Sequence, residues 1–83
     1  MYEVLIPRRV RRRLARLPES VYERVLAALK SLEEEPRPRG SLKMTNRDEW
    51  RVRVGDYRIV YNVDDEQRLV TILQVGHRRD IYR

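Results

Sequence analysis

Apolar and polar residues alternate most clearly in the middle of the chain, between residues 50 and 61. Two alternating runs are separated there by Gly55-Asp56, and a two-residue loop of this composition is typical of a tight β-hairpin. Such a loop sets Arg53 opposite Arg58. The pattern therefore predicts two antiparallel strands, and the residues that share one surface are Arg51, Arg53, Arg58 and Val60.

The first half of the chain has the spacing of helices. Residues 2–6 are rich in strand formers, and Pro7 then suits the first turn of a helix. Apolar residues recur at helical spacing on both sides of Pro18, which predicts a helical hairpin. The first stripe is Val10, Leu14 and Leu17, and the second is Val21, Val25, Leu29 and Leu32, supported by Leu26 and Ala28.

The second half of the chain contains several short segments of residues that favour turns. Pro36, Pro38 and Gly40 prevent the second helix from continuing, residues 41–44 are expected to form a short strand or an extended lead-in, and residues 45–48 a polar turn. Residues 64–67 predict another turn and residues 69–75 a nearly continuous apolar strand that Gly76 breaks, leaving residues 77–83 as a polar tail.

These elements together predict one α+β domain that spans residues 1–83. An N-terminal strand and a helical hairpin precede an antiparallel sheet of three or four strands. Both helices bury their apolar stripes on one face of this sheet. The opposite face, which carries the arginines of the hairpin, is then free to bind a partner.

Composition narrows the kinds of partner and of chemistry. The chain has 83 residues and a net charge of +6, and all of its 19 basic residues except Lys30 and Lys43 are Arg. This balance favours nucleic acid or another polyanion as the partner. The absence of Cys excludes a disulfide, a thiolate metal site and a Cys nucleophile, and a single His excludes a zinc site built from imidazoles. We expect no metal and no cofactor.

No apolar run approaches the roughly 20 residues needed to cross a bilayer. Nothing near the N-terminus resembles the apolar core of a signal peptide. We therefore expect no membrane association and a cytoplasmic location.

The arginines of the hairpin are the first candidate site. Like charges directly across a strand pair are destabilising, so stacking Arg53 on Arg58 is a poor choice for a purely structural sheet. Phosphates are the anions that Arg matches best, through its planar fork of donors. With Arg78 arriving from the end of the last strand, the four guanidiniums would hold a phosphodiester and stabilise its pentavalent transition state. The alternative is a solvated basic face.

The C-terminal segment adds two candidates. Nearby cations lower the pKa of a phenol, so Tyr82 is a candidate general base for a ribose 2′-OH, or a platform on which a base stacks. The alternative is an aromatic ring that packs the tail onto the sheet. His77 is a candidate general acid for the departing 5′-oxygen, because its ordinary pKa lies near neutrality. The alternative is a local hydrogen bond at a strand end.

The remaining charged residues carry less specific information. The arginines between Arg8 and Arg16 offer a sequence-independent contact to folded RNA. The alternative is that they form the solvent-exposed face of an amphipathic helix. The carboxylates at residues 33–35 and 64–66 suit a solvated helix end and a turn. They indicate no catalytic acid pair and no metal site.

At this point the order and spacing of the segments resemble a RelE-type toxin of a bacterial or archaeal toxin–antitoxin module, within the RelE/ParE superfamily. The segments that carry the resemblance are residues 50–61, the turn at 63–66, the closing run 75–82, and the Pro36-Arg37-Pro38-Arg39-Gly40 segment followed by Leu42-Lys43. It spans nearly the whole chain, and no single motif carries it alone.

The resemblance implies a microbial-ribonuclease-like α+β domain that enters the ribosomal A site and cleaves mRNA there without a metal. The 2′-OH attacks the adjacent phosphate and yields a 2′,3′-cyclic phosphate and a free 5′-OH. By position, Arg51 and Arg53 fall where the family often has Lys, Arg58 on its phosphate-binding Arg, Arg78 on its late Arg and Tyr82 on its functional Tyr. A cognate acidic, RelB-like antitoxin is the implied partner, beside the ribosome and mRNA.

One departure from the family pattern bears on mechanism. A guanidinium stays protonated, so Arg51 and Arg53 cannot carry a proton as a Lys would. Proton transfer then falls to Tyr82, to His77, or to groups of the substrate and ribosome. Two other readings remain open: a ParE-like inhibitor of DNA gyrase with the same fold, and a degenerate toxin that only binds its antitoxin.

Overall fold

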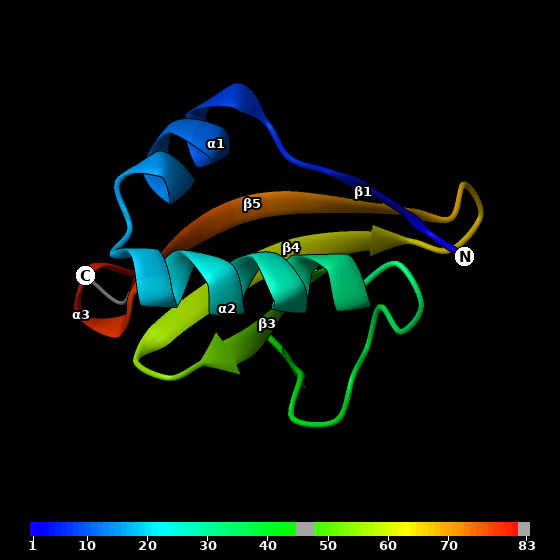
Figure 1. Cartoon of the computed structure of the whole chain (residues 1–83). Helices are drawn as coiled ribbons and strands as arrows, with labels where there is room; N and C mark the ends of the chain where they lie inside the picture. Colours follow the sequence, from blue (N-terminus) through cyan, green and yellow to red (C-terminus); the bar gives the residue numbers. More distant parts are fainter. Residues whose placement is uncertain (45–47, 82–83) are drawn as a thin grey trace.

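A mixed sheet of five strands runs through the molecule (Figure 1). The computed structural model describes residues 1–44 and 48–81, the last two of these by their backbone alone. The strands lie in the order β1-β5-β4-β3-β2. Their bounds are β1 (Glu3–Leu5), β2 (Leu42–Lys43), β3 (Glu49–Val54), β4 (Tyr57–Asp64) and β5 (Leu69–His77).

The α+β class predicted from the sequence is confirmed, with a larger and mixed sheet. The sequence predicted an antiparallel sheet of three or four strands, and β2 to β5 form four such strands. The difference is β1, which joins the same sheet by pairing with β5 in parallel. A parallel neighbour requires a long connection, and here both helices supply it. The helical hairpin is therefore the crossover that returns the first strand to the sheet beside the last.

The central hairpin has the predicted register. Arg53 lies opposite Arg58, and Val54 lies opposite Tyr57. Gly55 has a φ of +60°, as a glycine at the first central position of a two-residue hairpin turn requires. The turn thereby fixes which face each arginine occupies.

Two helices cover one face of the sheet. Helices α1 (Arg8–Ala15) and α2 (Glu19–Ser31) meet at Pro18, as predicted. Their buried residues share one core cluster with alternate residues of β4 and β5, and α2 crosses in front of the strands in Figure 1. The core is made of Val10, Leu14, Val25, Leu29, Leu32, Ile59, Tyr61, Val70, Ile72 and Val75. Leu26 is 42% exposed, so its predicted supporting role in the core stripe is wrong.

Helix α1 also lies beside β5, beyond the point where β1 ends. The Arg9 guanidinium donates a hydrogen bond of 2.9 Å to the carbonyl of Leu73. Leu73 is the extra residue of an irregularity in the β4–β5 pairing, where Val60 pairs with Gln74 and Tyr61 with Ile72. The helix thus satisfies part of the open edge of β5.

The end of the chain differs from the sequence prediction. Strand β5 continues through Gly76 to His77, so Gly76 does not break it. Gly76 pairs with Arg58, and a glycine within a strand leaves room at a place where another group approaches. Residues 78–81 form a short helix, α3 (Arg78–Ile81), where a polar tail was predicted. The Arg78 amide donates to the Asp56 carbonyl at 2.9 Å, which ties α3 to the hairpin turn.

The linker between α2 and the sheet contains the predicted short strand as β2. Three residues of the predicted polar turn, 45–47, lie outside the described residues. Within the described part of the chain, no helix has the length and apolar character that crossing a membrane demands.

Candidate nucleic-acid interface

Arg58 lies near the start of β4, on the face of the sheet that the helices leave uncovered. Its register partners are Arg53 on β3 and Gly76 on β5. Its neighbours in sequence, Tyr57 and Ile59, point to the helical side because successive side chains of a strand alternate. Only 7% of Arg58 is exposed, which is unusual for a charged residue.

Among the described residues, most of the charges that act on Arg58 are positive. Burial lowers the pKa of Arg58, and the nearby cations of Arg53, Arg51 and Arg78 lower it further, whereas Asp56 raises it. Arg51, Arg53 and Arg78, which were predicted to form one cluster with Arg58, therefore each lie close enough to Arg58 to act on it. An anion placed among them gains from several donors at once.

A pocket of about 430 Å³ opens over these side chains. Arg51, Arg53 and Arg58 contribute to its lining from two adjacent strands. The linker contributes Arg39 and Gly40, and β2 contributes Leu42. Sequence reasoning did not select Arg39 as a site residue, although the turn signal at Pro38 and Gly40 places an arginine at the corner of a turn.

His77 lies on the other face of the sheet from Arg58. It pairs with Tyr57, and the two rings meet edge to face with centroids 5.4 Å apart. Its Nδ1 accepts a hydrogen bond of 3.3 Å from the Arg79 amide. The structure therefore does not bring His77 together with the arginine cluster, and the local hydrogen bond considered as its alternative role is present. Tyr82 lies outside the described residues.

The arginine face continues towards α1. A second hollow, of about 580 Å³, is lined by Val60 and Gln74 of the sheet and by Arg9 and Arg13 of the helix. Val60 pairs with Arg51, so the two hollows adjoin on one surface. Two arginines of the Arg8 to Arg16 run thus border the same face as the central cluster.

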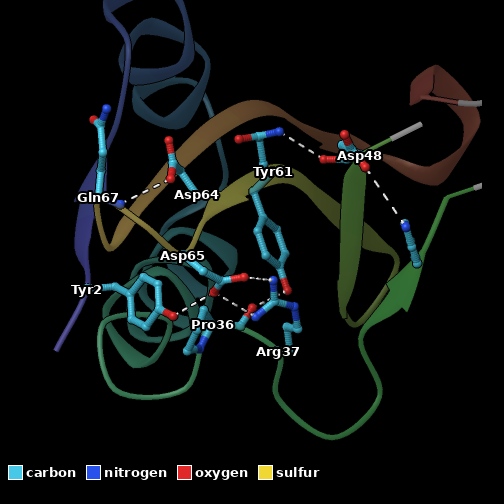
Figure 2. Close-up of polar contacts among 10 residues, drawn as sticks. Tyr2, Pro36, Arg37, Asp48, Tyr61, Asp64, Asp65 and Gln67 are labelled. Atoms are coloured by element: carbon cyan, nitrogen blue, oxygen red, sulfur yellow. Dashed lines mark hydrogen bonds and ion pairs between the residues drawn. The ribbon is translucent and has the colours of Figure 1, made fainter.

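A polar network lies at the far end of β4 (Figure 2). The Arg37 guanidinium donates two hydrogen bonds to the Asp65 carboxylate, at 3.1 and 2.8 Å, and lies 5.3 Å from the centre of the Trp50 ring. The Tyr2 hydroxyl donates to the same carboxylate at 2.7 Å. These donors hold the pKa of Asp65 at about 2, with Arg37 the larger cause.

The same region anchors the linker to the core. The Tyr61 hydroxyl donates a hydrogen bond of 2.8 Å to the carbonyl of Pro36 (Figure 2). Burial raises the pKa of Tyr61, while Ser41 and Arg37 act against this rise. Both sides of the turn that carries Arg39 therefore lie close to one fully buried tyrosine.

The described residues, 1–44 and 48–81, hold no group of three or more His, Asp or Glu side chains placed to bind a metal ion. What they do bring together is a guanidinium-lined pocket on a sheet face, in a small basic α+β domain. Guanidinium groups arranged in this way suit the recognition of phosphate groups, which RNA carries at every nucleotide.

Comparison with known proteins gives the family. Residues 4–82 match the family described as ParE toxin of type II toxin-antitoxin system, parDE. The chain is 38% identical to Toxin RelG of Mycobacterium tuberculosis, over 99% of this chain and 97% of that protein. The chain therefore belongs to the RelE/ParE family of toxins of type II toxin–antitoxin systems.

Solved structures agree with this assignment. The archaeal RelE–RelB complex from Pyrococcus horikoshii OT3 contains a chain that is 36% identical, with a TM-score of 0.80 and coverage of 93% of this chain and 94% of that one. The toxin–antitoxin complex RelBE2 from Mycobacterium tuberculosis gives 33% identity, a TM-score of 0.78 and coverage of 92% and 96%. Both similarities extend over nearly the whole fold.

Proposed function

We propose that this toxin is a metal-independent endoribonuclease that cleaves mRNA in the ribosomal A site and so stops translation in the cytoplasm. The observation that carries the proposal is that Arg51, Arg53 and Arg58 line one pocket, with Arg78 near enough to act on Arg58. A nearly buried guanidinium among other cations is stabilised by a phosphate, because the phosphate supplies negative charge and several acceptor oxygens.

The arginines act on charge that develops during cleavage. The ribose 2′-oxygen forms a bond to the adjacent phosphorus, the bond from phosphorus to the 5′-oxygen breaks, and the products are a 2′,3′-cyclic phosphate and a 5′-hydroxyl. The phosphorane transition state carries more negative charge than the ground state. Fixed guanidiniums therefore bind it more tightly than the substrate, which is the requirement for catalysis.

The two protons of this reaction need other carriers. One leaves the 2′-hydroxyl and one reaches the departing 5′-oxygen, and an Arg side chain remains protonated throughout. Tyr82 is the proposed carrier on this chain, with groups of the RNA and the ribosome as alternatives. His77 faces away from the arginine cluster, so we assign it a smaller part in proton transfer than the sequence suggested.

A cognate antitoxin is the proposed protein partner, since the similar solved structures include toxin–antitoxin complexes. An apolar groove of about 540 Å³ between the two helices gives such a partner a place to bind. Tyr22 and Leu26 border it and are 37% and 42% exposed, and Arg11 lies at its rim. An antitoxin with an apolar stripe and acidic flanks matches this surface.

The groove is tested with the cognate antitoxin, which we expect to be a short acidic protein encoded beside this chain. Leu26→Glu places a carboxylate in the groove and is expected to weaken the complex by about tenfold or more. Equal affinity of the variant and the wild type, measured by calorimetry, would show that the antitoxin binds elsewhere.

The nuclease activity is tested by adding the purified toxin to a translation extract and mapping mRNA 5′ ends. Cuts in phase with codons at stalled ribosomes, each with a 5′-hydroxyl end, are expected. The absence of such cuts would refute the nuclease proposal.

A second function is favoured by the family match itself, which carries the name ParE. A ParE-like toxin would inhibit DNA gyrase by binding and would cleave no RNA. A supercoiling assay separates the two: inhibition of gyrase together with intact mRNA supports the ParE-like function. If the chain shows neither activity but binds its antitoxin, it is a degenerate toxin.

A further inference from the structure

The arginine pocket has a wall that does not belong to the sheet hairpin. Arg39 lines it from the linker between α2 and β2, together with Arg51, Arg53 and Arg58. The position of Arg39 depends on how firmly the linker is held. The contacts of the linker on each side of Arg39 therefore decide whether it forms part of the site.

On its N-terminal side the linker is fixed at two consecutive residues. The carbonyl of Pro36 accepts the hydrogen bond from the hydroxyl of Tyr61, which is 0% exposed. Arg37 is bound through both ends of its guanidinium to Asp65, and its guanidinium lies over the ring of Trp50. A planar donor fork on a carboxylate fixes direction as well as distance.

On its C-terminal side the chain turns directly into the sheet. The Ser41 amide donates to the Pro38 carbonyl at 2.9 Å, and Gly40 has a φ of +91°. A positive φ at the third residue of such a turn is the mark of type II geometry, which glycine favours. Leu42 then pairs with Arg51. Arg39 thus occupies the corner of a turn that both flanks hold in place.

We infer that Arg39 is a fifth guanidinium of the site, which binds an RNA phosphate next to the scissile one, and that Arg37 and Asp65 position it. The inference rests on the proposed ribonuclease function and adds to it the path of the RNA strand. A phosphodiester chain carries a charge at every nucleotide. A strand whose scissile phosphate lies at Arg58 therefore brings a neighbouring phosphate to the linker wall.

Binding is measured with a short fluorescent single-stranded RNA that carries 2′-O-methyl groups, so that no cleavage occurs. Arg39→Ala is expected to raise Kd about tenfold, because a contact between charged partners is lost. One phosphate contact fewer also lowers the slope of log K against log salt by about 0.7. Arg39→Lys keeps the charge and should keep that slope.

Arg68→Asn is the matched control. It removes the same charge from the turn before β5, at the opposite end of that strand from Gly76. The φ of 53° at Arg68 is one that Asn tolerates. Its salt slope should equal that of the wild type. If Arg39→Ala and Arg68→Asn lower the slope equally, or if neither does, Arg39 is not a phosphate ligand.

The positioning role is tested by a double-mutant cycle. Asp65→Asn should weaken RNA binding when Arg39 is present and have no further effect in the Arg39→Ala background. Equal effects in the two backgrounds would overturn the positioning role, since they would mean a general loss of stability. If Arg39→Ala binds RNA like the wild type, the inference about Arg39 fails and the ribonuclease proposal still stands. If Arg58→Ala also binds RNA like the wild type, both proposals fail.

Discussion

Arg37 and Arg58 lie near opposite ends of β4 and have contrasting surroundings. Arg37 is paired through two hydrogen bonds with Asp65, which also accepts one from Tyr2 (Figure 2). The Arg37 guanidinium also lies over the ring of Trp50. Arg58 is 7% exposed, and the charges that act on it come mostly from other arginines. Arg37 is matched by an acid within the fold, whereas Arg58 lies among other arginines in the lining of an open pocket.

This difference separates stability from function along one strand. A cation matched by a carboxylate in the same chain has little to gain from a ligand. A cation crowded by like charges destabilises the folded protein, and a bound phosphate relieves that repulsion. Substitutions at the two ends should therefore affect different measurements, activity at one end and stability at the other.

Arg58→Ala should have the largest effect. Removal of one fixed charge donor from a transition state costs about 10² to 10³ in rate, and we expect a loss of mRNA cleavage of this size in the translation extract. The free energy of unfolding should change much less than the cleavage rate, because relief of repulsion among the arginines offsets part of the contacts that the nearly buried side chain loses. Arg58→Lys retains the charge without the planar fork of donors. Its cleavage rate should therefore lie between those of the wild type and Arg58→Ala.

The contrast fails if Arg58→Ala lowers stability strongly and leaves cleavage intact. Arg58 would then be a structural residue like Arg37. Arg68→Asn serves again as the control for general loss of positive charge, and should cleave at the wild-type rate.

Tyr61→Phe should have the next largest effect, on stability. The substitution leaves the carbonyl of Pro36 without its hydrogen bond in a buried position, which costs about 1 to 3 kcal/mol in the free energy of unfolding. Tyr57→Phe removes the same hydroxyl from a half-buried ring at the other end of β4. Urea denaturation of the two variants should show the larger loss for Tyr61, and equal losses would contradict the anchoring role.

The central hairpin was predictable because its determinants are local. The Gly55-Asp56 turn and the alternation on either side fix the register within twelve residues, from Trp50 to Tyr61. The arginine face followed from that register. The helical stripes were also local, except for Leu26, whose spacing allowed either the core or the groove between the helices.

The remaining features depend on contacts between distant segments. The parallel pairing of β1 with β5 joins residues 3–5 to residues 69–71, and no local pattern specifies it. Gly76 was interpreted as a strand end, although in the structure it continues β5 opposite Arg58. Arg39 lines the pocket from a linker that Tyr61 and Asp65 contact, and these contacts are not visible from its own neighbourhood in the sequence.

Gly55→Ala tests how strongly the turn holds the arginine end of the hairpin. A left-handed backbone costs a residue with a Cβ about 1 to 2 kcal/mol, and the new Cβ would lie 3.3 Å from the Arg24 guanidinium. Gly40→Ala isolates the backbone cost, because nothing lies within 4 Å of its Cβ. Both should lower the unfolding free energy by similar amounts, since the Arg24 side chain can move aside. A neutral Gly55→Ala would mean that the turn does not fix the register.

Asp65→Asn should give the smallest effect, and one that depends on pH. The ion pair is partly exposed, so its contribution at neutral pH is modest. The pKa of Asp65 is lowered from 3.8 to about 2, so the stability it adds is complete above pH 3.8 and is lost as the pH falls towards 2. The difference in Tm between the wild type and Asp65→Asn should therefore shrink across that window.

At alkaline pH the same network affects stability in the opposite direction: the contribution of Tyr2 is lost as the pH rises. The hydrogen bond to Asp65 raises the pKa of Tyr2 above 10.0, so the stability from this hydroxyl is present below 10.0 and is lost as the pH rises through the raised value. Tyr2→Phe should remove the loss of stability at alkaline pH. It should keep part of the loss at acidic pH, because Arg37 is the larger cause of the lowered pKa of Asp65. Glu66→Gln, one residue from Asp65, controls for loss of a surface charge. A flat Tm difference for Asp65→Asn from pH 7 to pH 2 would show that Arg37 is not matched within the fold, and the contrast with Arg58 would then rest on burial alone.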